Sequence, residues 1–172
     1  MSKFNLTSLK KQLKFKTQDE LIDEIATLYK SFSQVKEYYN SKNADPREIF
    51  ENYKNIIEKE FVYGKTRGYP KSRISVAKKA VTDFKKLSPK PYLLAELMLV
   101  YVESVSGFCT EFGVDVENYY TSSEAMFRDA LELLKKIGEL KKYQEMAKDI
   151  VNNATDGWGH YDDLKEIYDD FY

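Results

Sequence analysis

The chain has 172 residues, of which 42 % are apolar and 32 % charged, with 7 glycines and 4 prolines. This composition is typical of a globular protein and excludes a disordered one. The net charge of −1 excludes bulk attraction to nucleic acid or anionic lipid, and the single cysteine, Cys109, excludes an intramolecular disulfide and a cysteine-based metal site. The length predicts a single domain over residues 1–172, with a subdivision near 88–92 as the alternative.

The N-terminal part of the chain predicts two helices. Asn5 is expected to cap the first, which runs to about Phe15. Thr17-Gln-Asp-Glu20 is a capping box, because the Thr17 oxygen accepts an early backbone N–H and Glu20 reaches back to the cap. The next helix carries one apolar face at the helical period and ends in the polar stretch NSKNAD; the face comprises Leu21, Ile22, Ile25, Leu28, Tyr29, Phe32 and Val35.

No apolar run of signal-peptide length opens the chain, and no uninterrupted apolar segment approaches the roughly 20 residues of a membrane span. We therefore expect a cytoplasmic protein with no membrane partner.

The middle of the chain predicts two more helices with a break between them. Asp45 and Pro46 are the strongest start signal, and the helix they begin extends to about Phe61. Ser72 is expected to cap the next helix, which ends at the sequence SPKP because a residue before proline avoids helical angles.

The second half begins with a helix over about 92–112 that is apolar around most of its circumference, which is typical of a central helix. Gly113 ends it. Thr121 or Ser122 is expected to cap a further helix that Gly138 terminates. Another follows over about 140–151, and a last one begins near Tyr161.

The whole pattern predicts an all-α fold, an antiparallel array of seven or eight helices arranged as a bundle or a short repeat-like solenoid. No fixed repeat period returns along the chain.

The stretch FVYGKTRGYPKSR, residues 61–73, is the first candidate site. Its cations and glycines are suited to an anionic ligand, but the spacing of a phosphate-binding loop is absent. The alternative is a plain helix connection whose cations pair with the acidic second half of the chain. The candidate contact residues are Lys65, Arg67, Tyr69, Lys71, Ser72 and Arg73.

Charge is unevenly distributed along the chain. Residues 54–90 hold eleven basic and three acidic side chains, whereas residues 91–172 hold seven and seventeen. The basic part, including Lys78 and Lys79, could follow a nucleic-acid backbone, but a recognisable binding motif is absent. Glu96 and Glu103 lie seven residues apart on the apolar helix, and we expect them to pair with Arg67 or Arg73.

The only histidine, His160, lies near Asp156, Asp162 and Asp163. These could hold a metal, but adjacent aspartates point apart on a helix, so His160 is interpreted as a helix-start residue and Trp158 as a plug under the last helix. No Glu-x-x-His pair and no nucleophile motif occurs. We expect no catalytic residue, no metal and no cofactor.

The run LKKQLKFKTQDELIDEIATLYKSFSQVKEYY, followed by KSRISVAKKAVTDFKKL, resembles a family of small bacterial helical proteins known as a domain of unknown function. The resemblance covers most of the chain. It implies a bacterial cytoplasmic origin and an all-helical fold, and it transfers no catalytic residue. Lys71, Ser72 and Arg73 fall inside it.

Three functions stay open from the sequence. The first is a non-enzymatic helical module that binds a protein partner or itself. The second is a binder of anionic ligands or nucleic acid through the basic connection and helix over 65–79. The third is an enzyme of a type that the sequence does not identify.

Overall fold

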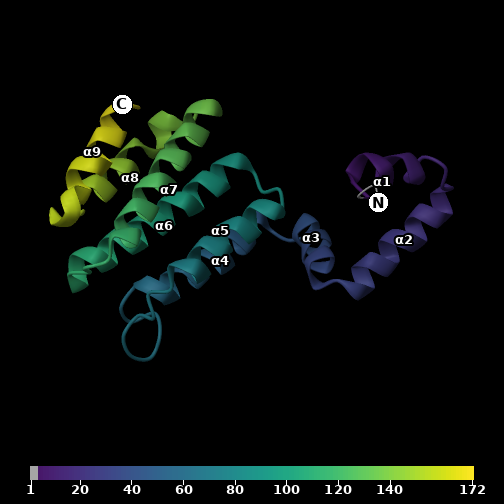
Figure 1. Ribbon diagram of the computed structural model, residues 1–172, viewed down its shortest axis with the longest axis horizontal. Coiled ribbons are helices and arrows are strands. Elements are labelled where there is room, and N and C mark those ends of the chain that lie inside the picture. The colour runs from purple at the N-terminus through teal and green to yellow at the C-terminus, as the bar shows by residue number, and fades with distance from the viewer. Residues whose placement is uncertain (1–3) are drawn as a thin grey trace. The chain divides into compact units, whose positions relative to one another are not determined.

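The computed structural model describes residues 4–172 and shows an all-α fold (Figure 1). Within these residues there are nine α-helices, one short 3₁₀ turn and no strand. The helices are α1 (Leu6–Leu13), α2 (Gln18–Ser31), α3 (Ser33–Asn43), α4 (Pro46–Phe61), α5 (Ile74–Lys86), α6 (Pro91–Phe112), α7 (Glu117–Lys136), α8 (Leu140–Asn152) and α9 (His160–Asp169). The all-α prediction is confirmed. The expectation about a signal peptide falls partly on residues 1–3, outside the described residues.

The chain divides into two compact units, residues 1–43 and residues 44–172. The segment near 88–92, where the sequence suggested a subdivision, lies inside the second unit. There, α6 contacts α4, α5, α7 and α8, and α9 packs on α7 and α8. The predicted central helix is therefore central within its unit.

The core of the second unit is built around α6, which buries residues on most of its circumference, including Leu97, Tyr101 and Val105. Cys109 is buried there, and burial raises the pKa of its thiol to about 11. By length and composition, α6 is the one helix in the described part of the chain that could cross a membrane, and 72 % of that stretch is buried inside the molecule. A core helix meets the same criterion.

Most of the predicted helix ends are confirmed by local geometry. Asn5 and Thr17 accept the backbone N–H groups of Ser8 and Glu20, and Asp45 caps α4 with Pro46 in the first turn. Gly113 takes the left-handed conformation after α6. Gly138, with a φ of 74°, follows the end of α7. Its N–H donates to the Lys135 carbonyl at 3.2 Å, and the Glu139 N–H donates to the Leu134 carbonyl at 2.9 Å.

Three predicted boundaries are wrong. The helix expected to run past Phe32 breaks there, because Phe32 is extended and α3 starts at Ser33. Helix α7 begins at Glu117, so Thr121 and Ser122 lie inside it and cap nothing. Ser72 is not a cap either, since α5 begins after Arg73 without a side-chain cap.

Candidate functional site

The connection between α4 and α5, residues 62–73, extends beyond the ends of those two helices (Figure 1). Gly64 and Gly68 have φ angles of 83° and 85°, which glycine adopts without strain. Ser72 also lies in the left-handed region, at 52°, where a residue with a side chain is held only by its surroundings. The course of the connection is therefore set by specific contacts at its end.

The first of these contacts is made by Glu60, a carboxylate that is 5 % exposed near the end of α4. Arg73 donates two side-chain hydrogen bonds to it, from Nη2 at 2.6 Å and from Nε at 2.9 Å, and its backbone N–H donates a third. The hydrogen bonds from the Arg73 side chain lower the pKa of Glu60 below its ordinary value. The connection is thus closed by a charge-assisted clasp between its two ends.

The second contact fixes Ser72. Its N–H donates to the Glu60 carbonyl at 2.7 Å, and the Tyr119 hydroxyl of α7 donates to the Ser72 carbonyl at 2.7 Å. These bonds satisfy the backbone groups of a residue in a strained conformation. Together with the clasp they hold the connection in one conformation.

Two cations of the connection form ion pairs with carboxylates of α4. Lys65 pairs with Glu58 at 2.7 Å, Arg73 pairs with Glu60, and Lys71 interacts electrostatically with Glu60. Arg67 has no hydrogen bond or ion pair within residues 4–172. The two paired cations are therefore bound by acids of the preceding helix, α4, and neither pairs with the acidic second half.

The same connection presents an exposed aromatic cluster. Tyr63 is 59 % exposed and Tyr69 77 % exposed, and their ring centroids lie 5.9 Å apart. The Tyr69 ring also lies 6.2 Å from that of Phe112, at the end of α6. The connection thus carries exposed tyrosines and an unpaired arginine, residue types that are enriched in contact surfaces.

Glu96 and Glu103 do not pair with Arg67 or Arg73, so that prediction is wrong. Glu96 accepts two hydrogen bonds from Arg47, the shorter at 2.6 Å, and one from the Tyr143 hydroxyl at 3.1 Å. Burial, followed by the Glu96 charge, raises the pKa of Tyr143. Glu103 is exposed and lines two hollows of about 230 and 300 Å³ beside α6. It has no ion-pair partner in the described part of the chain.

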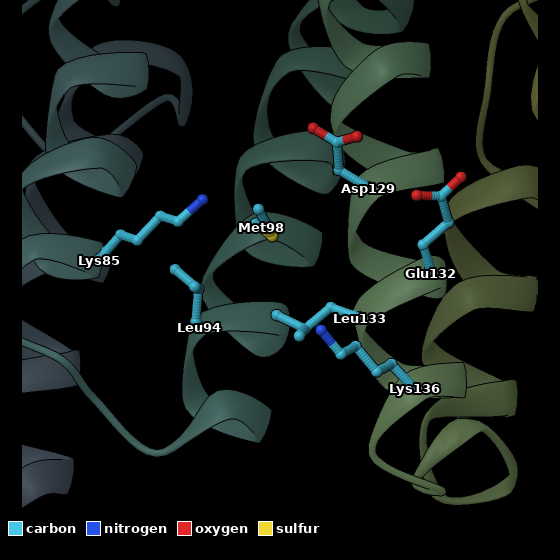
Figure 2. A pocket seen from close by; sticks show the side chains of 7 residues that line it. All are labelled: Lys85, Leu94, Met98, Asp129, Glu132, Leu133 and Lys136. Atoms are coloured by element: carbon cyan, nitrogen blue, oxygen red, sulfur yellow. The ribbon is translucent and has the colours of Figure 1, made fainter.

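A third hollow, of about 420 Å³, lies between α5 and the α6–α7 pair (Figure 2). Leu94, Met98 and Leu133 supply its apolar lining. The charged residues around them come from both sides: Lys85 from α5, and Asp129, Glu132 and Lys136 from α7. None of these four makes an ion pair with another described residue, so charges of both signs surround an open apolar surface.

His160 is completely buried at the start of α9 and joins three helices. Its Nδ1 lies 2.7 Å from Glu124 Oε1 of α7, and its Nε2 lies 3.2 Å from Ser106 Oγ of α6. These residue types resemble those of a hydrolytic triad, but Ser106 lies within α6, where the backbone N–H groups are used in helical bonds and cannot hold an oxyanion. We interpret the cluster as a structural anchor. No group of metal-binding side chains occurs among residues 4–172.

The helix-start interpretation of His160 is confirmed, whereas the plug assigned to Trp158 is wrong. Trp158 is 57 % exposed and stacks on Tyr120 at a centroid distance of 6.3 Å. The side chains that α9 buries are the His160 imidazole, Leu164 and Ile167.

The N-terminal unit carries a different kind of surface. None of the described residues in 4–43 is buried, although its helices contain many apolar side chains. On α2, Ile22 is 54 % exposed, Ile25 43 % and Leu28 40 %, and Phe32, which follows α2, is 53 % exposed. Helix α2 therefore presents an exposed apolar stripe, which we define as Ile22, Ile25 and Leu28.

Comparison with known proteins places the chain in one family. Residues 1–172 match the model of a Family of unknown function (DUF6155). The chain belongs to this family. No curated protein and no solved structure matches it. The resemblance to a domain of unknown function is confirmed, and the family supplies no activity or site residue.

Two important residues were missed by sequence reasoning. The sequence does indicate that Glu60 is unusual, because it lies beside Ile57 and Phe61 on the buried face of α4, where a carboxylate needs a partner. The sequence gives no such indication for Tyr119, because its bond to Ser72 spans 47 residues.

Proposed function

We propose that this protein is a non-enzymatic protein–protein interaction module whose contact surface is the exposed apolar stripe of α2. The observation that carries the proposal is the absence of any buried residue among described residues 4–43, alongside that stripe. Exposed apolar patches of this kind mark interaction surfaces.

The helices of the first unit are short and need packing to be stable. Helices α1, α2 and α3 have 8, 14 and 11 residues. Helices of this length are marginal in water and gain most of their stability by burying an apolar face. A bound protein that covers the α2 stripe would supply the burial that the first unit lacks.

The test uses the full-length chain with a photo-crosslinking amino acid in place of Ile25, irradiated in the cells that produce it. We expect cross-links to one defined polypeptide of another molecule, identified by mass. The matched control places the same amino acid at Thr27, which is exposed and lies about 200° around α2 from Ile25. Equal cross-linking at both positions, or cross-links only within one chain, would contradict the proposal.

A second candidate is binding of an anionic ligand or nucleic acid at residues 62–73. The observation that favours it is that the connection carries the unpaired Arg67 together with the exposed Tyr63 and Tyr69, since proteins bind single strands by combining cations with aromatic rings that stack on the bases. Pairing of Lys65, Arg73 and Lys79 with acids leaves fewer cations for such a ligand. Retention on single-stranded oligonucleotide at low salt, lost in Tyr69→Ala and kept in Thr27→Ala, would support it; no retention would remove it.

A further inference from the structure

The apolar positions of α2 are arranged symmetrically about Ile25. Leu21 and Tyr29 lie four residues to either side of it, and Ile22 and Leu28 lie three to either side. Reversing the direction of the helix about Ile25 therefore places apolar positions on apolar positions. A second copy of α2, running antiparallel, presents a matching stripe.

The charges of the same segment are segregated along it. Residues 18–24 carry four carboxylates, Asp19, Glu20, Asp23 and Glu24, and no cation. The rest of α2, residues 25–31, carries one cation, Lys30, and no carboxylate. In a parallel pair of copies the acidic halves would lie side by side, whereas in an antiparallel pair each acidic half lies beside a basic one. The helix dipoles also oppose one another only in the antiparallel arrangement.

We propose that the partner of α2 is the α2 helix of a second copy of this chain, in an antiparallel pair whose twofold axis passes beside Ile25. This inference rests on the proposed function and specifies its partner. Ile25 contacts Ile25 of the second copy, and Ile22 contacts its Leu28. Because α2 has only 14 residues, the contact is small and the dimer dissociates on dilution.

The experiment cross-links engineered cysteines in the full-length protein with a short bifunctional maleimide. The native Cys109 is buried, so the unmodified chain is the first control and should stay uncross-linked. Ile25→Cys should give a cross-linked dimer and Thr27→Cys should not. A mixture of Ile22→Cys and Leu28→Cys chains should give the mixed dimer, identified by a tag on one of them, in large excess over either homodimer.

The cross-linking pattern tests the relative orientation of the two α2 helices, and light scattering tests whether the partner is a second copy. Homodimers of Ile22→Cys in place of the mixed dimer would show a parallel pair and overturn the antiparallel arrangement. Light scattering of the unmodified chain should show the dimer mass at high concentration, with Ile25→Glu monomeric and Thr27→Glu unchanged. A monomer at every concentration would overturn self-pairing.

Failure of this inference is distinguishable from failure of the proposed function. Photo-cross-links from position 25 to a polypeptide of a different mass would leave the interaction module standing and exclude the second copy as its partner. Cross-links only within one chain, together with a monomeric mass, would overturn both.

Discussion

Helices α2 and α8 have almost the same length, 14 and 13 residues, and both have an amphipathic pattern, yet one buries its apolar face and the other does not. Helix α8 buries Tyr143, Ala147, Ile150 and Val151, whereas α2 buries no residue. The difference lies in their surroundings, since α8 packs on α6 and α9 within the second unit. Periodicity therefore predicts that a face exists, but it does not identify what covers that face.

The largest effect on stability is expected for a buried apolar residue of the second unit. Leu131 is completely buried in α7, and Leu131→Ala should lower the free energy of unfolding of the second unit by about 2–5 kcal/mol, because it removes buried apolar surface and leaves a cavity. Ile25→Ala on α2 should change it by less than about 0.5 kcal/mol. Urea denaturation of both variants, followed by the fluorescence of Trp158, measures the difference. Equal losses would show that the two units unfold together.

An intermediate effect is expected when the clasp between Arg73 and Glu60 is broken. Arg73→Met leaves the Glu60 carboxylate buried without its main donor, so the urea midpoint should fall, by less than in Leu131→Ala. Arg67→Met is the matched control, because Arg67 lies in the same connection without a partner in the described residues, and its midpoint should not change. A fall of the same size in both variants would contradict the clasp.

The clasp also predicts a pH dependence. The pKa of Glu60 is lower in the folded protein than its ordinary value of 4.5, so its contribution to stability is complete above pH 4.5 and is lost as the pH falls through the folded value. Glu60→Gln should therefore flatten the acid side of a plot of urea midpoint against pH, relative to the unmodified protein. An unchanged slope on that acid side would show that other carboxylates dominate there.

The smallest effect is expected at the cap of α2. Thr17→Ala removes the side-chain acceptor for the Glu20 N–H and should weaken α2 locally by about 1 kcal/mol. Hydrogen exchange should become faster in α2 and stay unchanged in α6, and the urea midpoint of the second unit should not move. A shifted midpoint would mean that the first unit contributes to the stability of the second.

Helix beginnings and ends governed by local chemistry were predictable from the sequence. Asn5, Thr17, Asp45, Gly113 and Gly138 each act through a backbone group within a few residues, so a short window of sequence contains their partners. The buried face of α6 was predictable for a similar reason, because its apolar residues outnumber what an exposed helix would carry.

Features decided by distant contacts were not predictable. The clasp required the buried position of Glu60, and the conformation of Ser72 required Tyr119 from a helix 47 residues later. The partners of the basic residues were also misjudged, because regional charge counts favoured the acidic second half over Glu58 and Glu60 nearby. The stretches on both sides of Phe32 favour helix, and the apolar positions keep the helical period across it. The sequence pattern therefore gives no indication of the break.

The position of His160 has a consequence for how the chain matures during its synthesis. Ser106 and Glu124 leave the ribosome long before the imidazole that joins them, and Leu164 and Ile167, which are buried in the same helix, emerge later still. Until then, the surface of α6 and α7 that α9 covers stays open to water, and the apolar part of that surface is not buried. Folding of the second unit is therefore completed only after translation of α9, and a nascent chain that stalls before this helix would expose that interior to chaperones and proteases.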